Sequence, residues 1–188
     1  NVQTSALFPL RNGSLLLVLD EELFQFQPDD KGGRFSPVRG TQEGRRRDKV
    51  IGAFKDGALC IQSQGEKAAR LEKYDGARFQ PFPAPLPDLS AGEEFSALLE
   101  AQNGELWLGS DRGVAGQHEG KWRIFTSTDK TTPEGVSSFI ELPDGKIWCG
   151  ARDKIWEFDG RDWSTLRTGF DRINALVRAR DGSVWVAS

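Results

Sequence analysis

The stretch "ELPDGKIWCG", Glu141 to Gly150, contains the pattern that decides the fold, an Asp-Gly pair followed two residues later by a hydrophobic-Trp pair. Four similar stretches occur elsewhere in the chain: "PLRNGSLLLV" from Pro9, "AFKDGALCIQ" from Ala53, "EAQNGELWLG" from Glu100 and "RARDGSVWVA" from Arg178. A pattern that recurs five times in 188 residues indicates a structural repeat rather than a catalytic motif.

The turn pairs of the repeat are evenly spaced. They are Asn12-Gly13, Asp56-Gly57, Asn103-Gly104, Asp144-Gly145 and Asp181-Gly182, with successive spacings of 44, 47, 41 and 37 residues. That period suits four strands with their turns. Each pair lies between short apolar segments and therefore predicts a β-hairpin, for which we expect a type I′ turn with positive φ at both central residues.

A second turn follows 15 to 20 residues after each of the first four pairs, and an aromatic residue follows that turn. The aromatic residues are Phe35, Phe79, Trp122 and Trp163. In the fourth copy the strands read "SSFIEL", "KIWCGA", "KIWEFD" and "WSTL". The sequence therefore predicts an all-β chain with almost no helix, a β-propeller segment of four-stranded antiparallel blades.

We expect residues 1–188 to form one propeller segment with four complete blades and the start of a fifth. The expected blades cover about 1–48, 49–92, 93–135, 136–172 and 173–188. A lone blade has two apolar faces, so neighbouring blades must cover them, and Trp107, Trp148 and Trp185 are expected to fill the space between blades. We expect a piece of a larger propeller, whose end faces meet the remaining blades or another copy of the chain.

The order of an apolar strand, Asp-Gly or Asn-Gly, and then x-hydrophobic-Trp-hydrophobic-Gly resembles the two-component regulator propeller repeat. The stretches "FIELPDGKIWCG" and "ALLEAQNGELWLG" resemble it most, whereas Leu16 and Cys60 stand at the Trp position in the first two copies. The resemblance implies a periplasmic or extracellular sensor domain in signal transduction. It also implies a membrane-anchored parent protein, no catalysis, and ligand binding of a small molecule or an oligosaccharide.

The charge balance and the few reactive residues narrow the alternatives. With 25 basic and 28 acidic residues and a net charge of −3, the chain is a poor candidate for nucleic-acid binding. His118 is the only histidine and lacks further ligands at metal-site spacing, so we expect no metal and no cofactor. Cys60 and Cys149 fall on second strands with a whole blade between them, and we expect two buried free thiols.

Two other functions stay open, a carbohydrate-active propeller enzyme or lyase and a protein-interaction scaffold. The carboxylates of the Asp-Gly turns are explained by turn chemistry, and no other carboxylates form a matched acid and base, so we expect no enzyme.

The ligand site is expected in the loops opposite the hairpin turns, because variable loops on a rigid scaffold carry binding residues. The candidates are Arg45, Arg46, Arg47, Asp111, Arg112, Arg152 and Asp153. The arginine run could pair with carboxylates of an acidic ligand, or could be a solvated basic loop. The recurrence of Arg112 and Arg152 fits either a ring of polar groups around a binding site or shared repeat ancestry.

Overall fold

The computed structural model describes residues 4–20, 22–39, 47–64, 69–87, 94–126 and 131–188. These residues form 18 β-strands and no helix. The strands pair in antiparallel fashion into four four-stranded sheets and one two-stranded sheet. This confirms the predicted fold of four blades and the start of a fifth. No helix in the described part of the chain is long and apolar enough to cross a membrane.

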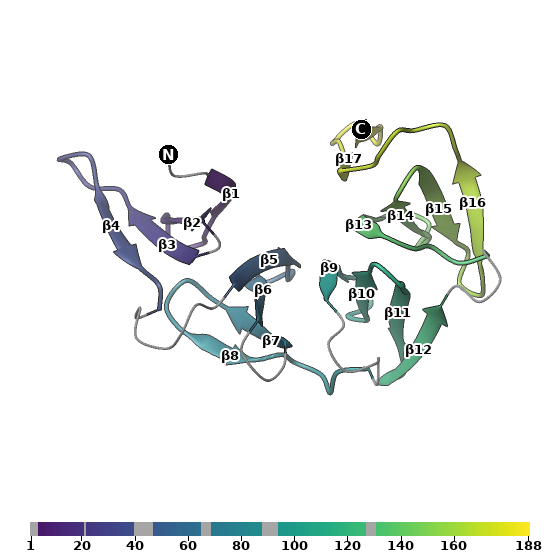
Figure 1. Cartoon of the computed structure of the whole chain (residues 1–188), viewed down its shortest axis with the longest axis horizontal. Coiled ribbons are helices and arrows are strands. Elements are labelled where there is room, and N and C mark those ends of the chain that lie inside the picture. Colours follow the sequence, from purple (N-terminus) through teal and green to yellow (C-terminus); the bar gives the residue numbers. More distant parts are fainter. Residues whose placement is uncertain (1–3, 21, 40–46, 65–68, 88–93, 127–130) are drawn as a thin grey trace. The chain divides into compact units, whose positions relative to one another are not determined.

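The chain divides into two compact units (Figure 1). The first unit contains blade 1, with strands β1 (Thr4–Pro9), β2 (Leu15–Leu19), β3 (Glu22–Gln27) and β4 (Arg34–Pro37). It also contains blade 2, with strands β5 (Arg47–Ala53), β6 (Leu59–Gln64), β7 (Ala69–Tyr74) and β8 (Phe79–Pro81).

The second unit contains two complete blades and one hairpin. Blade 3 consists of β9 (Phe95–Glu100), β10 (Leu106–Ser110), β11 (Gly113–His118) and β12 (Lys121–Thr126). Blade 4 consists of β13 (Val136–Glu141), β14 (Ile147–Ala151), β15 (Lys154–Phe158) and β16 (Trp163–Arg167). The two-stranded blade 5 consists of β17 (Ala175–Arg178) and β18 (Val184–Ala187).

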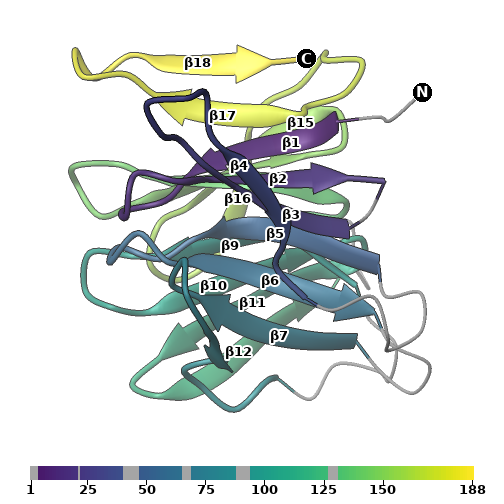
Figure 2. The ribbon, with the colours of Figure 1, turned by 90° about the vertical axis from the view of Figure 1, so that its left-hand side faces the viewer.

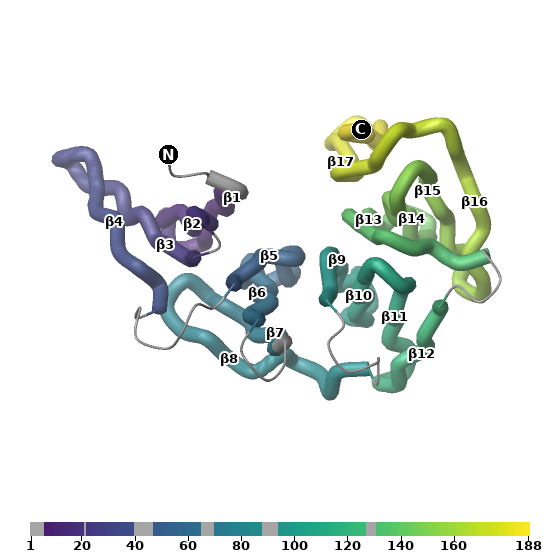
Figure 3. The backbone as a smooth tube through the Cα atoms, viewed as in Figure 1, coloured from purple at the N-terminus to yellow at the C-terminus, as the bar shows by residue number. Residues whose placement is uncertain are grey.

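The three sheets of the second unit lie side by side through their first strands. Strand β13 contacts both β9 and β17, and in Figure 1 the sheets spread outward from these strands. The chain returns from the outer strand β16 to β17 by one crossover, which Figure 3 traces at the yellow end of the tube. Within each unit the hairpin turns that follow the first strands lie at one end of the sheets (Figure 2). We call this the turn end and the opposite end the loop end.

The five hairpin turns differ from the predicted type I′ geometry. In the first, Gly13 has φ of +79° but Asn12 does not have positive φ. Gly13 N–H donates to the Leu10 carbonyl at 3.0 Å, and Leu10 N–H donates to the Ser14 carbonyl at 2.8 Å. These bonds define a three-residue loop, a type I turn followed by a left-handed glycine that forms a bulge. The other four hairpins have the same bonds, so the type I′ prediction was wrong at all five.

The Asn or Asp before each glycine has a second role. Its Oδ1 atom accepts a hydrogen bond from the backbone N–H two residues later, at 2.9 to 3.2 Å in all five turns. In the bulged turn this N–H points at the Asn or Asp side chain, which is short enough to accept its hydrogen bond. Asn and Asp are therefore interchangeable in the repeat because both have an Oδ1 acceptor.

The core of the second unit lies between blades 3 and 4. Trp107 is 4% exposed, and its ring centroid lies 4.8 Å from that of Phe158 and 5.8 Å from that of Trp163. Glycine makes room for this ring, because a Cβ atom on Gly116 would lie 2.6 Å from it. The Trp of the third copy therefore sits between its own blade and the next.

The other two repeat tryptophans have different surroundings. Trp148 packs against the buried cluster between blades 4 and 5, and its indole N–H donates to Glu157 at 2.8 Å. Trp185 is 69% exposed and is not enclosed between two blades of this chain. The two cysteines are both buried and free, as expected.

Candidate functional site

In the first unit, polar side chains from the loop end and the middle of the strands of blade 2 cluster around Arg39. This residue follows β4, on the way from blade 1 to blade 2. Its guanidinium donates to Glu72 Oε2 at 2.5 Å and to Ser63 Oγ at 3.3 Å. It also lies 3.6 Å from the centroid of the Phe79 ring, a cation–π contact. A cation, a carboxylate, a hydroxyl and an aromatic face are thus brought together on blade 2.

Asp48 lies next to this cluster on β5, directly opposite Ser63 in the strand register. Asp48 is only 6% exposed, and its Oδ1 atom accepts no hydrogen bond from the described residues. A buried carboxylate oxygen without a donor is costly, so this atom favours a hydrogen-bond donor. We call Arg39, Asp48, Ser63 and Glu72 the loop-end cluster.

In the second unit, the loop end is held together by backbone hydrogen bonds. Gly135 N–H donates to the Asp111 carbonyl at 3.0 Å, and Arg152 N–H donates to the Gly135 carbonyl at 3.1 Å. Ile173 N–H then donates to the Arg152 carbonyl at 2.6 Å. This series, which we call the backbone relay, runs from blade 3 through blade 4 to the segment that precedes blade 5.

The polar side chains beside the relay face outward, whereas Ile173 is buried. Asp111, Arg112, Arg152 and Asp153 are all exposed. Arg152 has φ of +49°, which its backbone bonds support, and its guanidinium lies 3.2 Å from the Glu134 carboxylate. The two predicted pairs of polar residues therefore lie at the loop end of one unit, where blade-to-blade backbone bonds fix their positions.

The predicted arginine run is only partly described. Arg45 and Arg46 lie outside the described residues, and Arg47 is the exposed first residue of β5 in the first unit. The sequence reasoning missed the loop-end cluster. One signal for it was available, because Asp48 has the same strand parity as Val50 and so occupies a position predicted to face the neighbouring blade.

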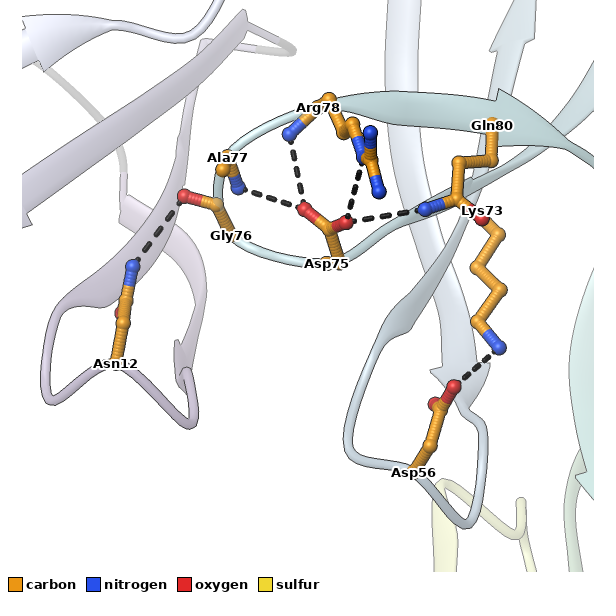
Figure 4. A network of polar contacts seen from close by, with 8 residues as sticks. All are labelled: Asn12, Asp56, Lys73, Asp75, Gly76, Ala77, Arg78 and Gln80. Carbon is orange, nitrogen blue, oxygen red and sulfur yellow. Dashed lines mark hydrogen bonds and ion pairs between the residues drawn. The ribbon is translucent and has the colours of Figure 1, made fainter.

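The turn end of the first unit shows how its carboxylates are used (Figure 4). One Asp75 oxygen accepts from the backbone N–H groups of Arg78 and Ala77, both at 2.9 Å, and these bonds lower the pKa of that carboxyl. The Lys73 side chain, bonded to Asp56, likewise lowers the pKa of the Asp56 carboxyl. These groups stay ionised as structural acceptors, and none is set up as a proton donor.

A further contact at this end joins the two blades of the first unit. The Asn12 side-chain amide donates to the Gly76 carbonyl at 3.3 Å, also drawn in Figure 4. The first hairpin turn of blade 1 is thus bonded to the second turn of blade 2. The turn end serves to align neighbouring blades.

The single histidine also lies at a turn end. His118 Nδ1 is 2.8 Å from Glu105 Oε1, and its side chain is largely exposed. Among the described residues, no three His, Cys, Asp or Glu side chains are grouped so that they could hold a metal ion.

Comparison with known proteins identifies the fold. The chain is similar to the extracellular domains of two hybrid two component systems from B. thetaiotaomicron, with TM-scores of 0.70 and 0.69 and sequence identities of 11% and 13%. Each match covers 98% of this chain and 26% of that domain. A virginiamycin B lyase from Staphylococcus aureus matches with a TM-score of 0.62 and 13% identity, over 99% of this chain and 63% of the lyase.

No family model and no curated protein matches the chain. The chain spans about a quarter of the length of the two-component extracellular domains. At such low identities the likeness concerns the fold alone. At that level it agrees with the repeat resemblance found in the sequence, so the chain shares the blade architecture of these extracellular domains.

Proposed function

We propose that this chain is a non-catalytic part of an extracytoplasmic sensor propeller that binds a small, hydroxyl-rich molecule or oligosaccharide at the loop end. The observation that carries the proposal is the loop-end cluster, and within it the buried Asp48 carboxylate with an Oδ1 atom that no described residue bonds. The fold likeness to two-component extracellular domains supports the sensor role and a periplasmic or extracellular location.

The chemistry of the loop-end cluster suits a sugar-like ligand. A buried carboxylate accepts hydrogen bonds from hydroxyl groups, and the planar Arg39 guanidinium has several N–H donors in a fixed arrangement. Its contacts with Glu72 and the Phe79 ring hold the guanidinium in place before a ligand arrives. A few fixed polar groups beside an apolar surface are typical of small-ligand sites. Binding at this site needs no proton transfer and no covalent step.

The test is a binding screen with neutral and acidic oligosaccharides, read by thermal shift and then by calorimetry. We expect Asp48→Asn and Arg39→Gln each to weaken binding of a hit by about tenfold or more, since truncating a charged hydrogen-bond partner costs about 1.5–3 kcal/mol. Arg34→Gln is the matched control, because Arg34 is an exposed arginine on β4 close to Arg39 in the chain. Equal affinity in all three variants would place the ligand elsewhere.

An enzyme is the second candidate, because a propeller lyase shares the fold. Incubating each hit with the protein and analysing the mixture by mass spectrometry separates the two functions. Under our proposal the ligand is recovered unchanged. Cleavage or isomerisation of the ligand that disappears in a loop-end carboxylate variant would replace the sensor proposal with a lyase or hydrolase.

A further inference from the structure

A series of side-chain hydrogen bonds crosses from blade 2 to blade 1 inside the first unit. The Tyr74 hydroxyl of blade 2 donates to Gln25 Oε1 of blade 1 at 2.8 Å. Gln25 Nε2 then donates to Ser14 Oγ at 2.7 Å, and Ser14 Oγ donates to Asn12 Oδ1 at 2.5 Å. The Asn12 amide returns to blade 2 through its bond to the Gly76 carbonyl. We call Asn12, Ser14, Gln25 and Tyr74 the joint series.

The sequence makes room for this series at the position where later copies of the repeat have Trp. Leu16 stands at that position in blade 1, and Gln25 is its partner in the strand register. In blade 3 the corresponding partners are Trp107 and Gly116, where the indole leaves no space for a side chain on its partner. Leucine is smaller than tryptophan, so the Gln25 side chain can reach Tyr74 across the two blades.

Tyr74 connects the joint series to the arginine of the loop-end cluster. Its ring pairs with that of Phe79, its partner in the strand register, at 4.7 Å between centroids and a tilt of 32°. The Arg39 guanidinium lies 3.6 Å from the centroid of the same Phe79 ring. Phe79 therefore contacts both the Tyr74 ring and the guanidinium, so the orientation of the first ring bears on the position of the charge.

We propose that Tyr74 is a positioning residue for the ligand site, which holds the Phe79 ring in the orientation on which the Arg39 guanidinium packs. The inference rests on the proposed function, because it concerns the affinity of the same site. Tyr74 is not a member of the loop-end cluster. It acts on the ligand through Phe79 and Arg39, and the bond from its hydroxyl to Gln25 fixes its own ring.

Burial explains why one hydroxyl group has this effect. Tyr74 is 3% exposed and Ser14 is 1% exposed, so water cannot replace a lost bond of the joint series unless the blades rearrange. All donors of the series point the same way, an arrangement in which hydrogen bonds strengthen one another. A long side chain that is held before binding loses less freedom when the ligand arrives, and the affinity is higher for that reason.

Nitrogen-15 NMR of arginine side chains in the ligand-free whole chain is the first test. The Arg39 Nε–H signal is assigned by its absence in Arg39→Gln. In the wild type we expect this signal to be displaced by the Phe79 ring current and to show little internal motion. In Tyr74→Phe, which keeps the ring and removes the hydroxyl, its shift and mobility should move toward those of the exposed Arg34.

Ligand affinity is the second test, with a hit from the oligosaccharide screen and calorimetry. Tyr74→Phe and Gln25→Met should each weaken binding by about threefold to tenfold, which corresponds to the net contribution of one hydrogen bond. The double variant should bind no more weakly than either single variant, because both changes remove the same bond. A change in stability alone would not alter the affinity of the folded chain.

Asp56→Asn is the matched control, because it removes the bond from Lys73, the neighbour of Tyr74 in the chain, without touching the joint series. We expect the Arg39 signal and the affinity to be unchanged in this variant, and an equal effect would overturn the proposal. An unchanged Arg39 signal in Tyr74→Phe would also overturn it, and so would wild-type affinity in that variant for a ligand that Arg39→Gln binds more weakly. If no ligand binds, the proposed function fails, and the Arg39 signal of the ligand-free chain then decides the positioning role by itself.

Discussion

Replacing Trp107 with alanine should destabilise the second unit by about 3 kcal/mol. Burial of the indole predicts a loss of about 3–5 kcal/mol, from lost contacts with Phe158 and Trp163 and the cavity left behind. The indole N–H has no hydrogen-bond acceptor among the described residues. Removing this buried, unsatisfied donor offsets part of the lost stability. The expected value therefore lies at the lower end of the range.

The assay is alkylation of Cys149, which belongs to the same buried cluster as Trp107. Burial raises the pKa of the Cys149 thiol well above its usual value, so labelling requires opening of the cluster. A loss of about 3 kcal/mol should accelerate labelling by more than about a hundredfold, measured by peptide mass spectrometry. Trp107→Phe, which keeps a ring without the N–H, should cost less. Acceleration below about tenfold for Trp107→Ala would refute the packing argument.

Three further outcomes follow from contacts described above. Gly116→Ala should lower the free energy of unfolding by about 1–3 kcal/mol in urea titrations, because its Cβ would overlap the Trp107 ring, and a neutral result would contradict that overlap. Cys60 should resist alkylation at pH 8 until denaturant is added, because burial raises the pKa of its thiol to about 12; rapid labelling of the folded chain would contradict this. Asp56→Asn should cost less than about 1 kcal/mol at pH 7, because its carboxylate is half exposed. The Lys73 contact lowers the folded-state pKa of Asp56, so this difference should shrink as the pH falls below the usual pKa of aspartate, and a difference that grows on acidification would refute the assignment.

The positions of the hairpins could be predicted from the sequence because each Asp-Gly or Asn-Gly pair specifies a tight turn between apolar strands. The turn type could not, because the pair fits both a two-residue type I′ loop and the observed three-residue loop with a bulge. The choice between them depends on the strand register, which the packing of whole blades decides. The Asn12 bond to Gly76 is an example of such packing, since it joins residues of different blades.

The candidate site was predicted less completely than the fold. Asp111, Arg112, Arg152 and Asp153 could be placed opposite the hairpin turns because Arg112 and Arg152 recur in the repeat, and their role in ligand binding stays a prediction. The cluster around Arg39 was missed because its partners are far away in sequence, with Glu72 33 residues further on.

The backbone relay has a consequence for how freely this end of the fold can vary in sequence. Because the bonds from Asp111 to Gly135, Arg152 and Ile173 are made by main-chain atoms, the cohesion of that end does not depend on which side chains occupy most of its positions. Gly135 and Ile173 are the exceptions, since a Cβ on Gly135 would lie 2.7 Å from the Arg152 side chain and Ile173 is buried in the core. Natural variation or laboratory selection can therefore change the outward side chains while the blades stay aligned.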